Sequence, residues 1–460
     1  MFMQAHRRVF IMKDIYKKRR ERLFSKMQDG VAILKTAKVC RKTRDIDFPF
    51  RQDSDFFYLT GFDEPNAFAV FEKKGKKKKF VLFVTPSQPE EEVWTGKRCG
   101  VQEAVKVFGA DEAYPSSEFL DKLKDFLTNA NALYMKFGND HDFERAIFEQ
   151  VAKIREQEKK GIFAPKKFFD ITDILSEMRL IKEKDEIETI KRACKLTGIA
   201  FRSAMQAVRP GMGEWELQAV FEFEIKRRGG KLAFDTVCAS GVNATVLHYS
   251  SNSCRIGGDG LVLLDGGAEV SYMASDVTRT FPVDGRFKEP WLSVYKWVLR
   301  AQNLAIETLK EGVTYAEVHE SALECLCEGL KALGVLKGST KEIIEERKYE
   351  PFFMHRIGHY LGLDVHDEGA YWLKEGKSRP LKAGMVITIE PGLYFPVVDF
   401  VPEHMRGIGV RIEDDCLITK NGCEVLTEDI PKNPEDVEKL MADGSFWDKL
   451  LPVSTDQSEI

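Results

Sequence analysis

The sequence predicts two consecutive domains, a small N-terminal α/β domain and a larger C-terminal α+β domain built from two similar halves. The chain has 460 residues, enough for two or three domains at roughly 100–200 residues each. Through residues 1–175, short β-rich runs such as GVAIL and KFVLFV alternate with helical runs such as SSEFLDKLKDFL. The pattern then changes, so we predict a second domain over 176–445 and a polar tail over 446–460.

The second domain is expected to begin with a long amphipathic helix. Apolar residues recur there at alternating steps of three and four, at Ile187, Ile190, Cys194, Thr197 and Phe201. Pro210 and Gly211 are expected to end this helix.

An internal repeat predicts the two similar halves. PGMGEWEL (210–217) aligns with EGVTYAEV (311–318) at a shift of 101 residues, from 210 to 311. In each copy a long helical run precedes the motif, and a second helix and then strands rich in Val, Ile and Leu follow it. We therefore expect two helix–helix–sheet units with a cleft between them.

Composition narrows the class of protein. The chain is 43% hydrophobic and 31% charged with a net charge of −4, which indicates a soluble globular protein without the basic surface of a nucleic-acid binder. The lysine-rich run 73–79 lies between two β-like runs and is expected to be a hairpin turn.

No apolar run approaches the ~18 residues of a membrane helix. The basic N-terminus continues into a charged amphipathic helix over 13–27, so we expect no targeting segment. Nine scattered cysteines without a CxxC motif indicate reduced thiols and a cytoplasmic protein.

Acidic residues end or interrupt several otherwise apolar strands. LVLLDGGAEVSYMASDVTRTF is expected to form a hairpin with Asp265 at the end of one strand and Asp276 at the start of the next. Glu390 follows the apolar run VITI, and Arg411 and Glu413 lie two apart on one face of a strand. Each acid could simply cap a turn or form a buried ion pair. Carboxylates on neighbouring strands repel each other unless a cation lies between them.

Histidines supply the matching nitrogen ligands. Three of the eight histidines, His355, His359 and His366, lie in MHRIGHYLGLDVHDEG (354–369), where Gly358 and Gly362 argue against a regular helix. One histidine with four carboxylates suits two hard or borderline divalent ions such as Mn²⁺. Spacing alone does not bring these residues together. For the other histidines, His6, His141, His319 and His404 at sites of ordinary composition, we expect structural roles.

An ordered set of motifs resembles the pita-bread metallopeptidases, the group of methionine aminopeptidase, prolidase and Xaa-Pro aminopeptidase. The motifs are FRQDSDFFYLTGFDEP, EMRLIKEKDEIE, LHYS, LLDGGAE with ASDVTRTFPV, FFMHRIGHYLGLDVHD, VITIEPGLY and GIGVRIEDD. They cover nearly the whole chain in family order and are most similar to bacterial-type Xaa-Pro aminopeptidases. The resemblance implies a creatinase-type N-terminal domain, a pita-bread catalytic domain and release of the first residue from peptides with proline second.

The resemblance also implies roles for single residues. The metal ligands would be Asp265, Asp276, His359, Glu390 and Glu413, with Glu390 also taking a proton from the attacking water. His366 would stabilise the oxyanion, His248 and His355 would line the proline pocket, and Arg411 and Tyr394 would lie near the substrate tail. Asp55 would approach the active site of a neighbouring chain in a dimer or tetramer. Prolidase, a metal-free creatinase-like hydrolase and a metal-free binding module are the alternatives.

Overall fold

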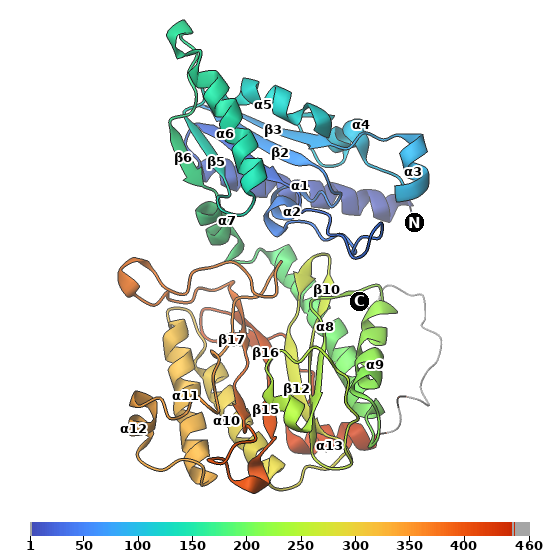
Figure 1. The fold of residues 1–460 in the computed structure, drawn as a ribbon, viewed down its shortest axis with the longest axis vertical. Coiled ribbons are helices and arrows are strands. Elements are labelled where there is room, and N and C mark those ends of the chain that lie inside the picture. The colour runs from blue at the N-terminus through green and yellow to red at the C-terminus, as the bar shows by residue number, and fades with distance from the viewer. Residues whose placement is uncertain (1, 444–445, 447–460) are drawn as a thin grey trace. The chain divides into compact units, whose positions relative to one another are not determined.

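The computed structural model describes residues 2–443 and residue 446. The chain divides after Met178 into two compact units (Figure 1). The domain boundary predicted near residue 175 falls inside helix α7 (Thr172–Arg179), where this division occurs. Apart from Phe446, the predicted polar tail lies outside the described residues.

The N-terminal unit is a six-stranded mixed sheet with the strand order β4-β3-β2-β1-β5-β6. Strand β2 pairs antiparallel with β1 and with β3. The parallel pairs are β4 with β3, β5 with β1, and β6 with β5. In chain order the elements are α1 (Phe2–Lys26), β1 (Gly30–Lys35), α2 (Ser54–Thr60), β2 (Phe68–Lys74), β3 (Lys77–Val84), α3 (Pro89–Thr95), α4 (Gly100–Lys106), β4 (Glu112–Pro115), α5 (Phe119–Leu127), β5 (Ala132–Met135), α6 (His141–Arg155), β6 (Lys167–Asp170) and α7. The predicted lysine-rich hairpin is confirmed as the β2–β3 turn.

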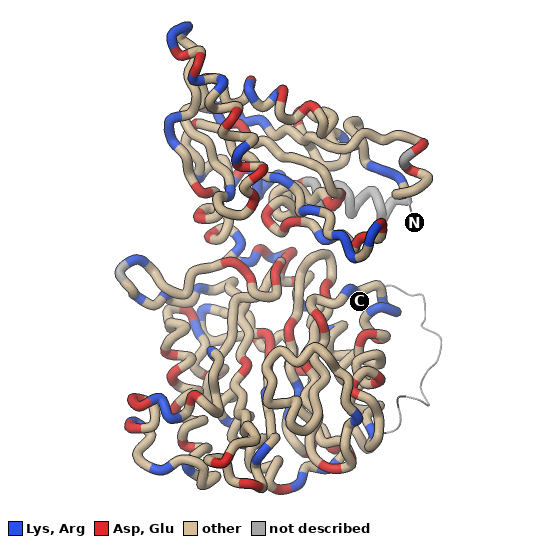
Figure 2. Tube along the Cα trace, viewed as in Figure 1, with Lys and Arg blue, Asp and Glu red and all other residues tan. Residues whose placement is uncertain are grey.

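Both faces of this sheet are covered by helices, as alternation along the strands requires. Val70 and Val81 point into a core with α5 and α6. Phe71 and Phe80, one position away, stack with ring centroids 5.1 Å apart, and Phe71 meets Phe24 of α1. Figure 2 shows basic and acidic residues interspersed along both units.

The C-terminal unit repeats one architecture twice. Figure 1 shows its strands between two helix pairs, α8–α9 and α10–α11. Its elements are α8 (Lys184–Ala207), α9 (Glu214–Lys226), β7 (Lys231–Leu232), β8 (Val237–Ser240), β9 (Leu261–Gly266), β10 (Ala268–Val270), β11 (Met273–Ala274), β12 (Val277–Pro282), α10 (Trp291–Thr308), α11 (Tyr315–Ala332), α12 (Thr340–Glu345), β13 (Val386–Ile389), β14 (Gly392–Tyr394), β15 (Gly409–Arg411), β16 (Asp414–Ile418), β17 (Cys423–Val425) and α13 (Pro434–Ala442).

The internal repeat marks equivalent positions in the two halves. The motif at 210–217 starts α9 and the motif at 311–318 starts α11. In both copies a glutamate, Glu216 or Glu317, accepts a hydrogen bond from the backbone N–H three residues earlier, at Gly213 or Thr314. The first half then adds the sheet β12-β9-β8 and the second half adds β13-β16-β17.

One predicted turn and one predicted strand differ from the structure. The expected turn after Asp265 contains a second small hairpin, β10–β11. The single strand expected over GIGVRIEDDCLIT is broken at residues 412–413, because β15 pairs with β14 whereas β16 pairs with β13. Pro391 lies opposite the break and has no N–H to continue the ladder. Glu390 and Glu413 therefore both lie in a gap between two ladders.

Candidate metal centre

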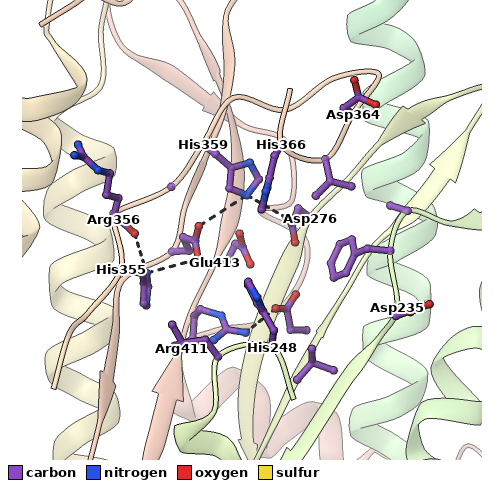
Figure 3. Close-up of a pocket in the computed structure, with 18 of the residues that line it drawn as sticks. Asp235, His248, Asp276, His355, Arg356, His359, Asp364, His366, Arg411 and Glu413 are labelled. Atoms are coloured by element: carbon purple, nitrogen blue, oxygen red, sulfur yellow. Dashed lines mark hydrogen bonds and ion pairs between the residues drawn. The ribbon is translucent and has the colours of Figure 1, made fainter. Parts of the chain in front are cut away.

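The residues predicted as metal ligands surround one pocket of the C-terminal unit, with a volume of about 790 Å³. In Figure 3, His359 and His366 enter this pocket from one side and His248 and Arg411 from the other, with Asp276 and Glu413 between them. The pocket is lined by nine of the eleven predicted site residues, namely His248, Asp265, Asp276, His355, His359, His366, Glu390, Arg411 and Glu413.

His359 is held in the orientation of a metal ligand. Its Nδ1 lies 3.0 Å from the carbonyl oxygen of Tyr360, which can only accept, so Nδ1 carries the proton. Its Nε2 faces Asp276 Oδ2 at 3.3 Å and Glu390 Oε1 at 3.8 Å. One ligand atom each of Asp276, His359 and Glu413 lie within 4.8 Å of one another. A second hydrogen bond that fixes the ring is typical of metal-binding histidines.

Asp265 and Glu413 are oriented by hydrogen bonds from neighbouring side chains. Asp265 Oδ2 accepts a hydrogen bond from Arg411 Nη2 at 2.6 Å. Its Oδ1 is buried and has no hydrogen-bond partner within the described part of the chain. Thr278 Oγ1 donates to Glu413 Oε2 at 2.7 Å. A buried carboxylate oxygen without a partner is costly unless it binds an ion.

The electrostatics of the cluster favour bound cations. Burial, and secondly repulsion from Asp276, raises the pKa of Asp265 to about 6, although Arg411 opposes this shift. Burial raises the pKa of Glu390 to about 7 and that of Glu413 well above its ordinary value. These acids could stay ionised at neutral pH if divalent ions compensated their charge. The donor set of carboxylate oxygens and one imidazole nitrogen fits such ions.

His355 belongs to an ordered chain of hydrogen bonds. Arg411 Nη1 donates to the hydroxyl of Tyr394 at 3.0 Å, and that hydroxyl donates to His355 Nε2 at 2.9 Å. The Nδ1 of His355 donates to the carbonyl oxygen of Arg356 at 2.8 Å. Burial and the charge of Arg411 lower its pKa to about 3. The ring is therefore neutral, and with both nitrogens engaged it forms a wall of the pocket rather than a proton carrier.

His366 and His248 are the more exposed histidines of the pocket. The ring centroid of His366 lies 4.2 Å from that of His359. Desolvation and the neighbouring His359 ring lower the pKa of His366, which keeps it neutral with one N–H to donate. Phe234, Val237 and Leu247 add apolar surface beside His248.

Two predicted residues do not line the pocket. Tyr394 is fully buried behind it and acts through Arg411 and His355. Asp55 lies in α2 of the N-terminal unit, is 1% exposed, and pairs with Lys136 at 2.8 Å. The approach of Asp55 to a neighbouring chain stays a prediction, and within its own unit its carboxylate pairs with Lys136.

Several supporting residues were not predicted from the sequence. Arg279 Nη2 binds Asp414 Oδ1 at 2.6 Å, and the same guanidinium donates to the carbonyl oxygen of Glu413. Asp415 accepts from the backbone N–H of Asp276 at 3.1 Å and from the thiol of Cys194 at 3.3 Å. The sequence IEDD carried a signal for two of them, since Asp414 and Asp415 directly follow Glu413. Two neighbouring acids on a buried strand face opposite sides, so each needs a buried partner of its own.

The two-half fold and the cluster of four carboxylates and one histidine define a metal-dependent hydrolase. Residues 188–420 match the model of metallopeptidase family M24, and residues 16–134 match the aminopeptidase P N-terminal domain. An Xaa-Pro aminopeptidase of Haemophilus influenzae is 39% identical over 432 residues, which cover 93% of this chain and 97% of that protein. One from Escherichia coli is 37% identical and covers 94% and 98%.

Solved structures agree with these matches. Pseudomonas aeruginosa aminopeptidase PepP superposes with a TM-score of 0.91 at 38% identity, covering 94% of this chain and 98% of that one. A zinc-substituted Escherichia coli aminopeptidase P in complex with product gives 0.90 at 37% identity, covering 93% and 98%. This chain belongs to metallopeptidase family M24. The predicted pita-bread fold and the prediction of a metallo-aminopeptidase are confirmed. Within the described residues, no helix is long and apolar enough to cross a membrane.

Proposed function

We propose that this chain is an Xaa-Pro aminopeptidase that hydrolyses the bond before a proline in second position at a centre of two divalent ions. The observation that carries the proposal is the convergence of four largely buried carboxylates and His359 Nε2 on one pocket. The curated relatives of Haemophilus influenzae and Escherichia coli carry the same activity in their names, over nearly their full lengths.

Five residues would hold the ions: Asp265, Asp276, His359, Glu390 and Glu413. Bound divalent ions would supply Lewis-acid polarisation of the scissile carbonyl and acidify a water molecule. Mn²⁺ is the expected ion because oxygen ligands dominate, and the zinc-substituted relative has the same fold. Asp265 Oδ1, buried without a partner among the described residues, supports this ligand set.

The other side chains handle protons and charge. Glu390, whose Oε1 lies 3.8 Å from His359 Nε2, would accept the proton of the attacking water. The neutral ring of His366 would donate its N–H to the carbonyl oxygen as that oxygen gains negative charge. Arg411 holds Asp265 through Nη2 and Tyr394 through Nη1, so it connects a ligand with the substrate wall.

Proline specificity follows from the shape and chemistry of the pocket. An Xaa-Pro bond has no N–H, so an enzyme for it gains nothing from an acceptor aimed at that position. His355 presents a neutral ring whose nitrogens are already engaged, and Phe234 and Leu247 add apolar surface. We infer that the proline ring binds between His248 and His355.

One assay with three substrates tests the proposal. The protein is treated with chelator, Mn²⁺ is restored, and Gly-Pro-Ala, Gly-Pro and Gly-Ala-Ala are compared. Metal-dependent release of glycine from Gly-Pro-Ala alone supports the proposal. Cleavage of the dipeptide alone would make the chain a prolidase, and no cleavage with metal bound would leave a binding role.

We further propose a cytoplasmic homo-oligomer. All nine cysteines, which lie within the described residues, have free thiols, as expected for a reducing compartment. The oligomer follows from the family resemblance and is tested by sedimentation of the metal-loaded protein, where a monomer would contradict it.

A further inference from the structure

A buried glutamate holds the loop that carries His248. Glu214, the first residue of α9, has no exposed surface. Its carboxylate accepts five hydrogen bonds, all from segment 240–254: Ser240 N and Oγ at 2.8 Å, Asn243 Nδ2 at 3.1 Å, and Tyr249 OH and Cys254 N at 2.9 Å. The donors precede and follow His248, so the carboxylate spans the loop on both sides of this residue.

Besides Glu214, another buried side chain holds this loop, that of Asn252. It accepts a hydrogen bond from the backbone N–H of Cys238 at 2.9 Å and donates to the carbonyl oxygen of Thr236 at 2.7 Å. After a short 3₁₀ turn at 241–245, residues 246–254 form neither helix nor strand. Tyr249 OH also accepts from Ser253 N at 3.2 Å, so the hydroxyl bound to Glu214 closes the loop on itself. A glutamine could not replace the carboxylate, because its NH₂ group would face a backbone N–H, that of Ser240 or of Cys254, and leave this donor unpaired.

The equivalent residue of the second half also binds a loop that carries histidines. A shift of 101 residues takes Glu214 to Tyr315, the first residue of α11, which is 2% exposed. The Tyr315 hydroxyl accepts from the backbone N–H of Gly358 at 2.9 Å and donates to the carbonyl oxygen of the same residue. Gly358 lies between His355 and His359. A Cβ there would meet the carbonyl oxygen of Thr388 at 1.9 Å, so this loop also lies tightly against β13.

We propose that Glu214 and Tyr315 are pseudo-equivalent positioning residues, each of which fixes the histidine-bearing loop of its own half in the pocket. Neither side chain lines the pocket, so each acts through the loop that it holds. The inference rests on the proposed function for the roles of His248, His355 and His359. The anchoring itself rests on the hydrogen bonds alone and can be measured without any activity.

The first test compares Glu214→Gln with the matched control Glu216→Gln. Glu216 is half-buried two positions along the same helix and binds Gly213 N and Arg255, outside the loop core. In the metal-loaded protein, Glu214→Gln should speed amide hydrogen exchange over 240–254 and lower kcat/KM for Gly-Pro-Ala about 10–100-fold. Bound metal should not change, since all five ligands lie elsewhere. Glu216→Gln should leave both readouts unchanged.

A double-mutant cycle separates positioning from general destabilisation. In a His248→Ala background, Glu214→Gln should lower kcat/KM by less than about twofold, because its effect passes through His248. Equal losses in both backgrounds, or unchanged exchange over 240–254, would overturn the proposal for this half.

The second half is tested by Tyr315→Phe against Tyr295→Phe, a buried tyrosine whose hydroxyl donates to the carbonyl oxygen of Lys432. Tyr315→Phe should weaken Mn²⁺ binding about tenfold in competition with a chelator, because His359 follows Gly358 directly. Tyr295→Phe should not change this affinity, and unchanged affinity in Tyr315→Phe would overturn the proposal. If the wild-type protein did not cleave Gly-Pro-Ala but exchange and metal affinity responded as stated, the positioning roles would stand and the proposed function would fail.

Discussion

The two halves of the C-terminal unit share one scaffold but expose their acids in different ways. In the first half, Asp265 lies inside an unbroken ladder, paired with Thr278 across β9 and β12. In the second half, Glu390 and Glu413 lie in the gap between the β13–β16 and β14–β15 ladders. The gap lets two acids from facing segments, Glu390 and Glu413, turn toward the same pocket. A regular sheet positions Asp265, with Asp276 directly before its strand β12, and an interrupted sheet positions Glu390 and Glu413.

The halves also differ in how they hold their histidines. The first half contributes His248 on a loop that is anchored by the carboxylate of Glu214, which accepts five hydrogen bonds from it. The second half contributes His355, His359 and His366, and its anchor Tyr315 binds a single residue, Gly358. The second loop is tied to the strands as well, because the backbone N–H of Thr388 donates to the carbonyl oxygen of His359 at 2.8 Å.

The largest expected effect comes from removing the acid that faces both halves. Asp276→Asn should abolish turnover of Gly-Pro-Ala, beyond the ~10²–10³-fold loss typical for one oxyanion donor, because the charge opposite His359 is lost. The circular dichroism spectrum should not change. Asp284→Asn, an exposed acid just after the same strand, is the control. Turnover by Asp276→Asn at saturating Mn²⁺ would refute the role of Asp276.

A smaller loss is expected at the histidine that donates to the substrate. His366→Ala should lower kcat about 10²–10³-fold with little change in KM or bound metal, because its N–H acts on charge that develops in the transition state. Steady-state kinetics and metal analysis check this. His404→Ala, in a short 3₁₀ turn away from the site, should behave as wild type. A rise in KM alone would instead place His366 in ground-state binding.

Chelation should change stability in a pH-dependent way. The pKa values of Asp265 and Glu390, raised to about 6 and about 7, mean that these two carboxyl groups bind more protons in the chelator-treated folded protein than in the unfolded chain between about pH 4 and pH 7. Their contribution to the free energy of unfolding therefore falls as pH rises through this range, whereas His355, whose pKa is lowered to about 3, contributes in the opposite direction. His359, with a pKa raised to about 9, extends the fall to higher pH.

Mn²⁺ should remove this slope by replacing the protons. At a free concentration 100 times its Kd, it should also add about 2.7 kcal/mol of stability. Melting midpoints at pH 5 and pH 8, with and without Mn²⁺, measure both effects. Asp276→Asn should show a smaller Mn²⁺ response, and a stabilisation by Mn²⁺ that did not grow from pH 5 to pH 8 would contradict the charge argument.

The smallest expected effect concerns the helix caps of the two halves. Thr314 caps α11 with its side chain, whereas the equivalent position before α9 is Gly213. Thr314→Ala should therefore cost about 1 kcal/mol and lower the melting midpoint by about 2–4 °C, with kcat unchanged. A loss of activity without loss of stability would mean that the cap also supports Tyr315.

The repeat and the acidic strand ends could be predicted from the sequence because both depend on local pattern. The 101-residue shift marked equivalent helix starts, and apolar runs that end in Asp265 or Glu390 marked the ligand strands. The break at residues 412–413 could not be predicted in this way. It depends on Pro391, which lies opposite in space but 21 residues earlier in sequence, from 391 to 412.

The supporting residues were missed for a similar reason. Glu214 resembled an ordinary acid in the first turn of a helix, where helix dipoles favour carboxylates. Its five donors come from residues 26–40 positions away, and no periodicity reports them. Asp55 was assigned by family resemblance alone, and its ion pair with Lys136 could not be read from the sequence, because the two residues lie far apart in the chain.

Because Glu413 lies between the two halves, metal affinity should depend on how the halves are aligned with each other. The backbone N–H of Glu413 donates to the carbonyl oxygen of Thr278 at 3.0 Å, and Arg279 binds its carbonyl oxygen, so this residue of the second half is fastened to a strand of the first. Close-packed interiors transmit small displacements. A substitution in the core of either half that shifts it against the other would change the spacing of the ligands, and metal affinity would report the shift before the fold is lost.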